Sequence, residues 1–232
     1  MRFASISNEI MFYVFISLFG LFSLINVIAA FFEKEKIRHI SKPFCLLFLG
    51  ASIISASLDF WILGLGCFFG SLGDLLLLYK EKKPLLLGGL VSFFVGHCLY
   101  IARALIYFNS LNLLRLPEFL YGSLAIFLVF YCLACQILYK VTRKSKVFTF
   151  GGALYATVLL LVLSTSILGC ALGLGRFYAI SVAGSALFIA SDTFLTFTIF
   201  GHDVKRRDFY IMVPYLLGEA GITLGILFTA LI

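Results

Sequence analysis

Two acidic residues interrupt long apolar runs in this sequence. Asp74 lies within "GSLGDLLLLY" (70–79), and Asp192 lies within "GSALFIASDTFLTF" (184–197). A charged side chain in such a run is too costly to face lipid, so we expect it to face other helices or a water-filled cavity. Two carboxyl groups in one apolar cavity can hold different protonation states, one serving as acid and the other as base. The two aspartates are therefore candidate catalytic residues.

Further polar groups fall at similar depths in other apolar runs. At 1.5 Å per residue from the predicted helix ends, the two aspartates lie about 9–12 Å and Glu219 about 15 Å from one surface, with His97 slightly deeper. Among the eleven tyrosines, Tyr100, Tyr155 and Tyr215 are placed near this layer. We expect these groups to converge on one interior cavity. A purely structural, hydrogen-bonded role stays open for each of them.

The composition determines the broad class of the protein. Hydrophobic residues make up 62% of the 232 residues and charged residues 12%, with a mean hydropathy of +1.10. A soluble domain is about half apolar and about a quarter charged. The composition therefore predicts a polytopic membrane protein, and the lack of strict apolar–polar alternation argues against an outer-membrane barrel. The six cysteines lie in apolar runs, which indicates packing and no disulfide framework.

The apolar runs predict an all-α membrane protein with eight transmembrane helices in a single domain, 1–232. The first run is too long for a cleavable signal and ends in "EKEKIRH", so we interpret it as a retained span. Pro43, Pro84 and Pro117 fall at or just before the starts of spans, where a missing N–H costs little, whereas Pro214 falls inside the last span. The predicted spans are 10–32, 43–60, 61–79, 84–108, 118–139, 147–170, 177–200 and 209–231.

Basic residues alternate between the two ends of these spans. Of the 18 Lys and Arg residues, 14 lie in the loops after the first, third, fifth and seventh spans. The positive-inside rule places these loops in the cytoplasm, so we expect both termini on the non-cytoplasmic side and the acids in the cytoplasmic half. The net charge of +7 is explained by these basic loops, so it does not indicate nucleic-acid binding. Asp74 and Asp192 each lie on the third helix of one half, which indicates a duplicated four-helix unit.

Several motifs occur together in an order that resembles one family. Besides the two aspartate segments, which include Ser191 beside Asp192, they are "KPF" (42–44), "FFVGHCLYI" (93–101) and "GGALYATVLLL" (151–161). Together they resemble the YhhN-like membrane proteins, the lysoplasmalogenase family that includes the animal transmembrane-protein-86 enzymes. The last helix departs from the family pattern, because Gly218-Glu219 stands where an Ala-Gln pair is usual.

The resemblance implies an alkenyl ether hydrolase that depends on Asp74 and Asp192. Such an enzyme cleaves the vinyl ether of a lysoplasmalogen to a fatty aldehyde and a glycerophospho-alcohol. A vinyl ether is stable to base and labile to acid, so a neutral carboxyl would protonate the carbon β to oxygen while an ionised one stabilises the cation and activates water. The sequence leaves open which aspartate is the acid. The supporting or substrate-binding candidates are Lys42, His97, Tyr100, Tyr155, Ser191, Tyr215 and Glu219.

The expected partners are a lysophospholipid substrate and the surrounding membrane lipids, with no nucleic acid, metal or cofactor. Lys42 either meets the lipid phosphate or serves as a snorkelling topology signal. We expect a bacterial inner membrane as the location. Two other functions stay open: a proton-coupled transporter that uses the same carboxylates, and a non-catalytic lipid-binding protein.

Overall fold

The computed structural model describes residues 5–79, 81–115, 117–142, 146–199 and 204–231. These residues form eight α-helices and two short 3-10 helices, with no strand, and seven of the helices are long and apolar enough to cross a membrane. The chain is therefore an all-helical, multi-pass membrane protein. The elements are α1 (Ile6–Phe31), α2 (Glu35–Ala56), η1 (Leu58–Phe60), α3 (Trp61–Leu77), α4 (Lys83–Ser110), η2 (Leu113–Arg115), α5 (Pro117–Thr142), α6 (Lys146–Ala171), α7 (Phe177–Ile199) and α8 (Arg207–Leu231).

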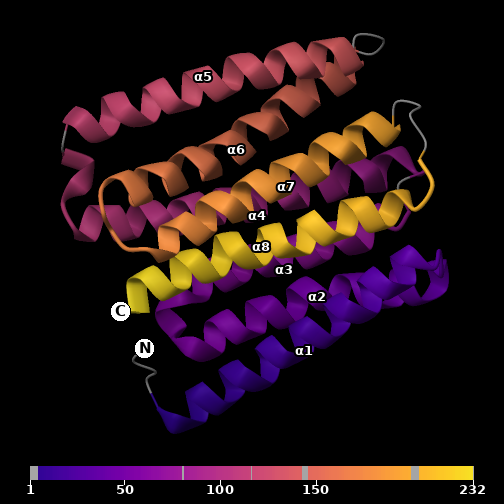
Figure 1. The fold of residues 1–232 in the computed structure, drawn as a ribbon, viewed down its shortest axis with the longest axis horizontal. Coiled ribbons are helices and arrows are strands. Elements are labelled where there is room, and N and C mark those ends of the chain that lie inside the picture. Colours follow the sequence, from indigo (N-terminus) through magenta and orange to yellow (C-terminus); the bar gives the residue numbers. More distant parts are fainter. Residues whose placement is uncertain (1–4, 80, 116, 143–145, 200–203, 232) are drawn as a thin grey trace.

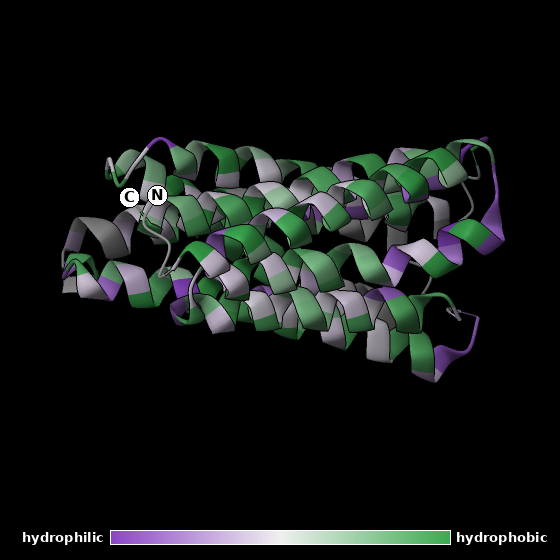
Figure 2. Ribbon diagram, turned by 90° about the horizontal axis from the view of Figure 1, so that it is seen from below, coloured by the Kyte–Doolittle hydropathy of each residue, from purple (hydrophilic) through white to green (hydrophobic). Residues whose placement is uncertain are grey.

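The helices run side by side along one direction (Figure 1). The pair α1 and α2 forms one edge of the bundle, α5 and α6 form the other, and α3, α4, α7 and α8 lie between them. Helix α1 begins and α8 ends at one end of the bundle, and the odd-numbered helices end at the opposite end. Hydrophilic residues gather near the helix ends and apolar residues fill the middle (Figure 2). Which end faces the cytoplasm stays a prediction.

Most predicted helix boundaries lie close to the observed ones, and the start of α2 is the main exception. The helix begins at Glu35, and Pro43 lies inside it, so placing Pro43 at the start of a span was wrong. The reason is Asn26, a buried residue of α1. Its amide donates to the backbone carbonyl of Arg38 at 3.0 Å and to the Ser41 hydroxyl at 2.8 Å. These bonds hold the charged segment as a helix for two turns before the proline.

The other proline and turn predictions are confirmed. Pro84 lies in the first turn of α4, Pro117 is the first residue of α5, and Pro214 lies inside α8. The tight connection predicted around residue 60 is the 3-10 turn η1, which leads directly into α3 at Trp61. Trp61 is exposed, which suits an aromatic residue at the membrane interface.

Glycines bring two helix pairs into backbone contact. A Cβ atom added at Gly96 of α4 would lie 2.8 Å from the carbonyl oxygen of Gly66 on α3. A Cβ atom added at Gly184 of α7 would lie 2.6 Å from the amide nitrogen of Ile222 and 2.8 Å from the carbonyl oxygen of Gly218, both on α8. Small residues allow this close approach of membrane helices. The third and fourth helices of each half thus pack alike, while the four-helix repeat stays a prediction.

Adding one methyl group at the α7–α8 contact should destabilise the fold. We expect Gly184→Ala to lower the free energy of unfolding by about 1–3 kcal/mol, because the backbone atoms that it meets cannot move aside. Gly20→Ala is the matched control, since nothing lies within 4 Å of a Cβ atom there and alanine favours the helix. Thermal unfolding in detergent measures both. Equal stabilities of the two variants would contradict the close approach.

Candidate active site

Asp74 is the centre of a buried ion pair. Its side chain is 0% exposed, and the Nζ atom of Lys42 lies 2.9 Å from its Oδ1 atom. The Tyr215 hydroxyl donates a hydrogen bond of 2.7 Å to the other oxygen, Oδ2. A cation and a hydroxyl donor both stabilise the ionised form of a carboxyl group. Lys42 of α2 and Tyr215 of α8 thus both stabilise the ionised form of Asp74 on α3.

Helices α2 and α3 are tied together beside this ion pair. Ser71, one turn before Asp74, donates its hydroxyl to the backbone carbonyl of Pro43 at 2.7 Å. This bond fixes the position of the adjacent Lys42, whose Nζ atom also lies 5.7 Å from the centre of the Tyr215 ring. The Lys42 ammonium is thus engaged inside the bundle with Asp74. A contact of Lys42 with a lipid phosphate stays a prediction.

Glu219 forms a second buried group with His97 and Tyr100. The Tyr100 hydroxyl donates to the Oε2 atom of Glu219 at 2.8 Å, and the Nε2 atom of His97 lies 3.8 Å from Oε1. The Nδ1 atom of His97 must carry a hydrogen, because it bonds to the carbonyl oxygen of Phe93 at 2.8 Å. A neutral His97 ring therefore presents a proton-free Nε2 towards Glu219. At 3.8 Å this is a buried electrostatic contact, longer than a hydrogen bond.

Asp192 lies near both groups but has a different environment. Residue Asp192 is half-buried, and its carboxyl group interacts with the Tyr155 hydroxyl of α6. The carboxyls of Asp74, Asp192 and Glu219 are close enough to interact electrostatically, and Lys42 acts on Asp192 as well. The structure therefore brings the three predicted acids into one cluster. Each of the three acids has a tyrosine hydroxyl as a partner, and Asp74 differs in that it also pairs with the Lys42 cation.

Aromatic rings separate and surround these acids. The His97 ring centre lies 4.5 Å from that of Phe188, 5.4 Å from that of Tyr100 and 6.4 Å from that of Tyr155. The Phe188 ring in turn lies 5.6 Å from the Tyr215 ring. Such rings exclude water and lower the local dielectric constant, which strengthens interactions between charges. The cluster is thus a polar centre enclosed by apolar walls.

The scan against family models matches the YhhN family over residues 37–226, which is most of the chain. The chain belongs to the YhhN family. The matched region contains every predicted site residue, from Lys42 to Glu219. Searches of curated proteins and of solved structures gave no match.

The Ser191 side chain of this YhhN protein contacts α8 and is not part of the acid cluster. Its hydroxyl donates to the backbone carbonyl of Ile211 at 2.9 Å, so it ties α7 to α8. Three residues close to the acids were not predicted as part of the site: Ser71, Phe93 and Phe188. Each lies about one helical turn before a predicted site residue, and this spacing was the available signal. Within the described ranges, no three His, Cys, Asp or Glu side chains gather so that they could hold a metal ion.

The glutamate that departs from the usual family pattern should be replaceable by glutamine. In Glu219→Gln, the side-chain oxygen can still accept the hydrogen bond from the Tyr100 hydroxyl. We expect its free energy of unfolding to stay within about 1 kcal/mol of wild type. Glu219→Leu leaves the Tyr100 hydroxyl only the weaker Cys67 sulfur, at 3.4 Å, and should cost about 1–3 kcal/mol. Thermal unfolding compares the two, and equal losses would contradict the bonding described here.

Proposed function

We propose that this YhhN protein hydrolyses the vinyl ether bond of a lysoplasmalogen. The carbon β to the ether oxygen takes a proton, and water adds to the resulting oxocarbenium ion at the α carbon. The hemiacetal then separates into a fatty aldehyde and a glycerophospho-alcohol. The observation that carries the proposal is the cluster itself: Asp74, paired with Lys42 and Tyr215, lies near Asp192 in an aromatic-walled interior. Glycosidases use two such carboxyls for a related oxocarbenium reaction.

The surroundings of the two aspartates support different roles. Asp74 is paired with the Lys42 cation, so it is the ionised group that stabilises the oxocarbenium ion and accepts a proton from water. A carboxylate has about four lone-pair sites, so beyond these two contacts it can still accept a hydrogen bond from a water molecule. Asp192 interacts with the neutral phenol of Tyr155, and two nearby carboxyls in a low dielectric do not easily both ionise. Asp192 is therefore the acid that protonates the vinyl ether.

The position of the cluster suits a single-chain lipid. The head group of such a lipid lies at the membrane surface and its ether bond lies just below. The basic residues after the odd-numbered helices support a cytoplasmic location for that end of the bundle, with both termini on the opposite side of a bacterial inner membrane. The reaction would then take place in the cytoplasmic half of the bilayer.

The direct test is aldehyde release by protein purified in detergent. A lysoplasmenyl-ethanolamine should yield fatty aldehyde, whereas the saturated 1-alkyl analogue should not, because it has no double bond to protonate. Both are incubated with the protein, and aldehyde is measured by mass spectrometry. If ethanolamine and choline lysoplasmalogens both remain intact, the proposal is wrong.

The alternative is a proton-coupled transporter, favoured by the burial of Asp74, His97 and Glu219 within the bundle, because ionisable residues inside a membrane are typical of proton relays in transporters. A transporter needs a gradient and a sealed vesicle, and detergent-purified protein has neither. Uptake of a lysolipid into proteoliposomes that depends on a proton gradient, together with no aldehyde release in detergent, would favour the transporter.

A further inference from the structure

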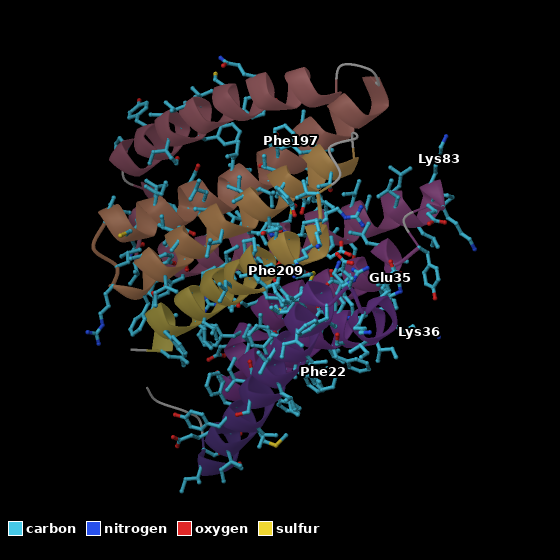
Figure 3. All side chains as sticks on the ribbon, turned by 45° about the vertical axis from the view of Figure 1, so that its right-hand side comes forward. Phe22, Glu35, Lys36, Lys83, Phe197 and Phe209 are labelled. Atoms are coloured by element: carbon cyan, nitrogen blue, oxygen red, sulfur yellow. The ribbon has the colours of Figure 1, made fainter. Side chains whose placement is uncertain are left out.

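A cavity of about 320 Å³ lies at the end of the bundle where α1 meets α2 and where α8 begins. Its lining includes Glu33, Arg38, Arg206 and Asp208. Glu35, Lys36 and Lys83, labelled in Figure 3, project from the same end of the molecule. We infer that this cavity binds the zwitterionic head group of the substrate, a phosphate joined to an amine. The inference rests on the proposed function, since it concerns the lipid that the acid cluster would cleave.

The lining of the cavity carries charges of both signs. Arg38 pairs with Asp208 at 3.2 Å, and Arg207 pairs with the same carboxyl at 3.3 Å, which fixes α2 to the first turn of α8. The guanidinium carbon of Arg206 lies 4.0 Å from the centre of the Phe31 ring. Stacking uses the face of a guanidinium and leaves its in-plane N–H groups to bind an anion. Arg206 is thus a phosphate-binding candidate held in place by an aromatic ring.

The acidic lining residues point to an amine beside the phosphate. The α1–α2 turn contributes Glu33 and the start of α2 contributes Glu35, and both would repel a lone phosphate but attract an ammonium group. Glu33 and Arg206 both have left-handed backbone conformations, with φ of 56° and 59°. Such conformations are uncommon outside glycine and occur often at ligand sites, where the surrounding structure holds them. A ligand with both charges fits this lining better than a simple anion.

The cavity lies about one helical turn from the acid cluster along α2. Arg38 precedes Lys42 by one helical turn, about 6 Å along α2, and Lys42 contacts Asp74. One glycerol unit joins a lysoplasmalogen head group to its vinyl ether, so the two must bind within about one or two turns of each other. Since Lys42 is already paired with Asp74, the phosphate needs other cations, and this cavity supplies them.

The test measures binding to wild-type protein and to Arg206→Gln, without using turnover. The probes are the non-hydrolysable 1-alkyl-lysophosphoethanolamine, the head-group-free 1-alkylglycerol and inorganic phosphate. Wild-type protein should bind the phosphoethanolamine probe at least tenfold more tightly than the alkylglycerol, and Arg206→Gln should remove most of that ratio. Lys83→Gln is the matched control: it removes a positive charge at the same end but outside the cavity, and it should leave the ratio unchanged.

Three results would overturn the inference. The first is a wild-type ratio near one, and the second is an equal loss in Arg206→Gln and Lys83→Gln. The third is inorganic phosphate binding as tightly as the lipid through Arg206, which would assign the cavity to free phosphate. Arg206-dependent binding of the lipid without aldehyde release from a lysoplasmalogen would keep the head-group site and reject the hydrolysis. Aldehyde release with no head-group preference would keep the hydrolysis and reject the head-group site.

The amine half of the inference has its own comparison. The 1-alkyl-glycerophosphate probe has the phosphate but lacks the amine. Wild-type protein should prefer the phosphoethanolamine probe over this one severalfold, and Glu33→Gln should reduce that preference. Equal binding of the two probes to wild-type protein would show that no amine is recognised.

Discussion

Replacing Asp74 by asparagine should lower the rate of vinyl ether hydrolysis about 10³-fold and should also destabilise the fold. The rate falls because the amide can neither stabilise a cation by charge nor accept the proton of water. The fold weakens because Lys42, whose side chain is only 15% exposed, loses its partner. Removing one member of a buried ion pair costs about 3 kcal/mol or more. Aldehyde release and thermal unfolding, both in detergent, measure the two effects.

A double variant separates these two effects. In Lys42→Met/Asp74→Asn, no uncompensated charge remains inside the bundle, so most of the lost stability should return. Activity should remain low, because the carboxylate is still missing. If the double variant hydrolysed lysoplasmalogen at the wild-type rate, Asp74 would have no role beyond pairing with Lys42.

Replacing Asp192 by asparagine should also reduce the rate about 10³-fold, but with nearly unchanged stability. Asparagine keeps an oxygen that can face the Tyr155 hydroxyl, yet it has no carboxyl proton to give to the substrate. Binding of the 1-alkyl analogue should persist, which separates an enzyme from a lipid-binding protein. Asp59→Asn is the matched control, since Asp59 is an exposed acid at the opposite end of the bundle. A similar loss of activity in both variants would remove Asp192 from the mechanism.

The helical architecture could be predicted from sequence because each helix carries its own signals. Long apolar runs, a proline in the first turn and basic residues in the connections are local features, and they located α4 and α5 well. The start of α2 was not predictable in this way. Its first two turns look like a charged loop, but they are helical and are held by Asn26 of another helix, which bonds to the Arg38 carbonyl and the Ser41 hydroxyl.

The acids of the site could also be predicted, because a carboxyl in an apolar run is conspicuous. The hydrogen-bond and ion-pair partners of these acids could not be predicted, because the contacts join residues that are far apart in the sequence. Tyr215 and Asp74 are separated by 141 positions, and Glu219 and Tyr100 by 119. The ion pair between Lys42 and Asp74 depends on how α2 packs on α3, which no local sequence pattern specifies. The different roles that we propose for the two aspartates rest on these partners.

The complete burial of Asp74 has a consequence for the fate of the product. In the proposed reaction, a long-chain aldehyde forms at a carboxylate that water outside the protein does not touch. Such an oily, reactive compound would leave sideways into the hydrocarbon of the bilayer, while the water-soluble glycerophospho-alcohol diffuses away from the surface. Any enzyme that detoxifies the aldehyde would therefore have to collect it from the lipid phase.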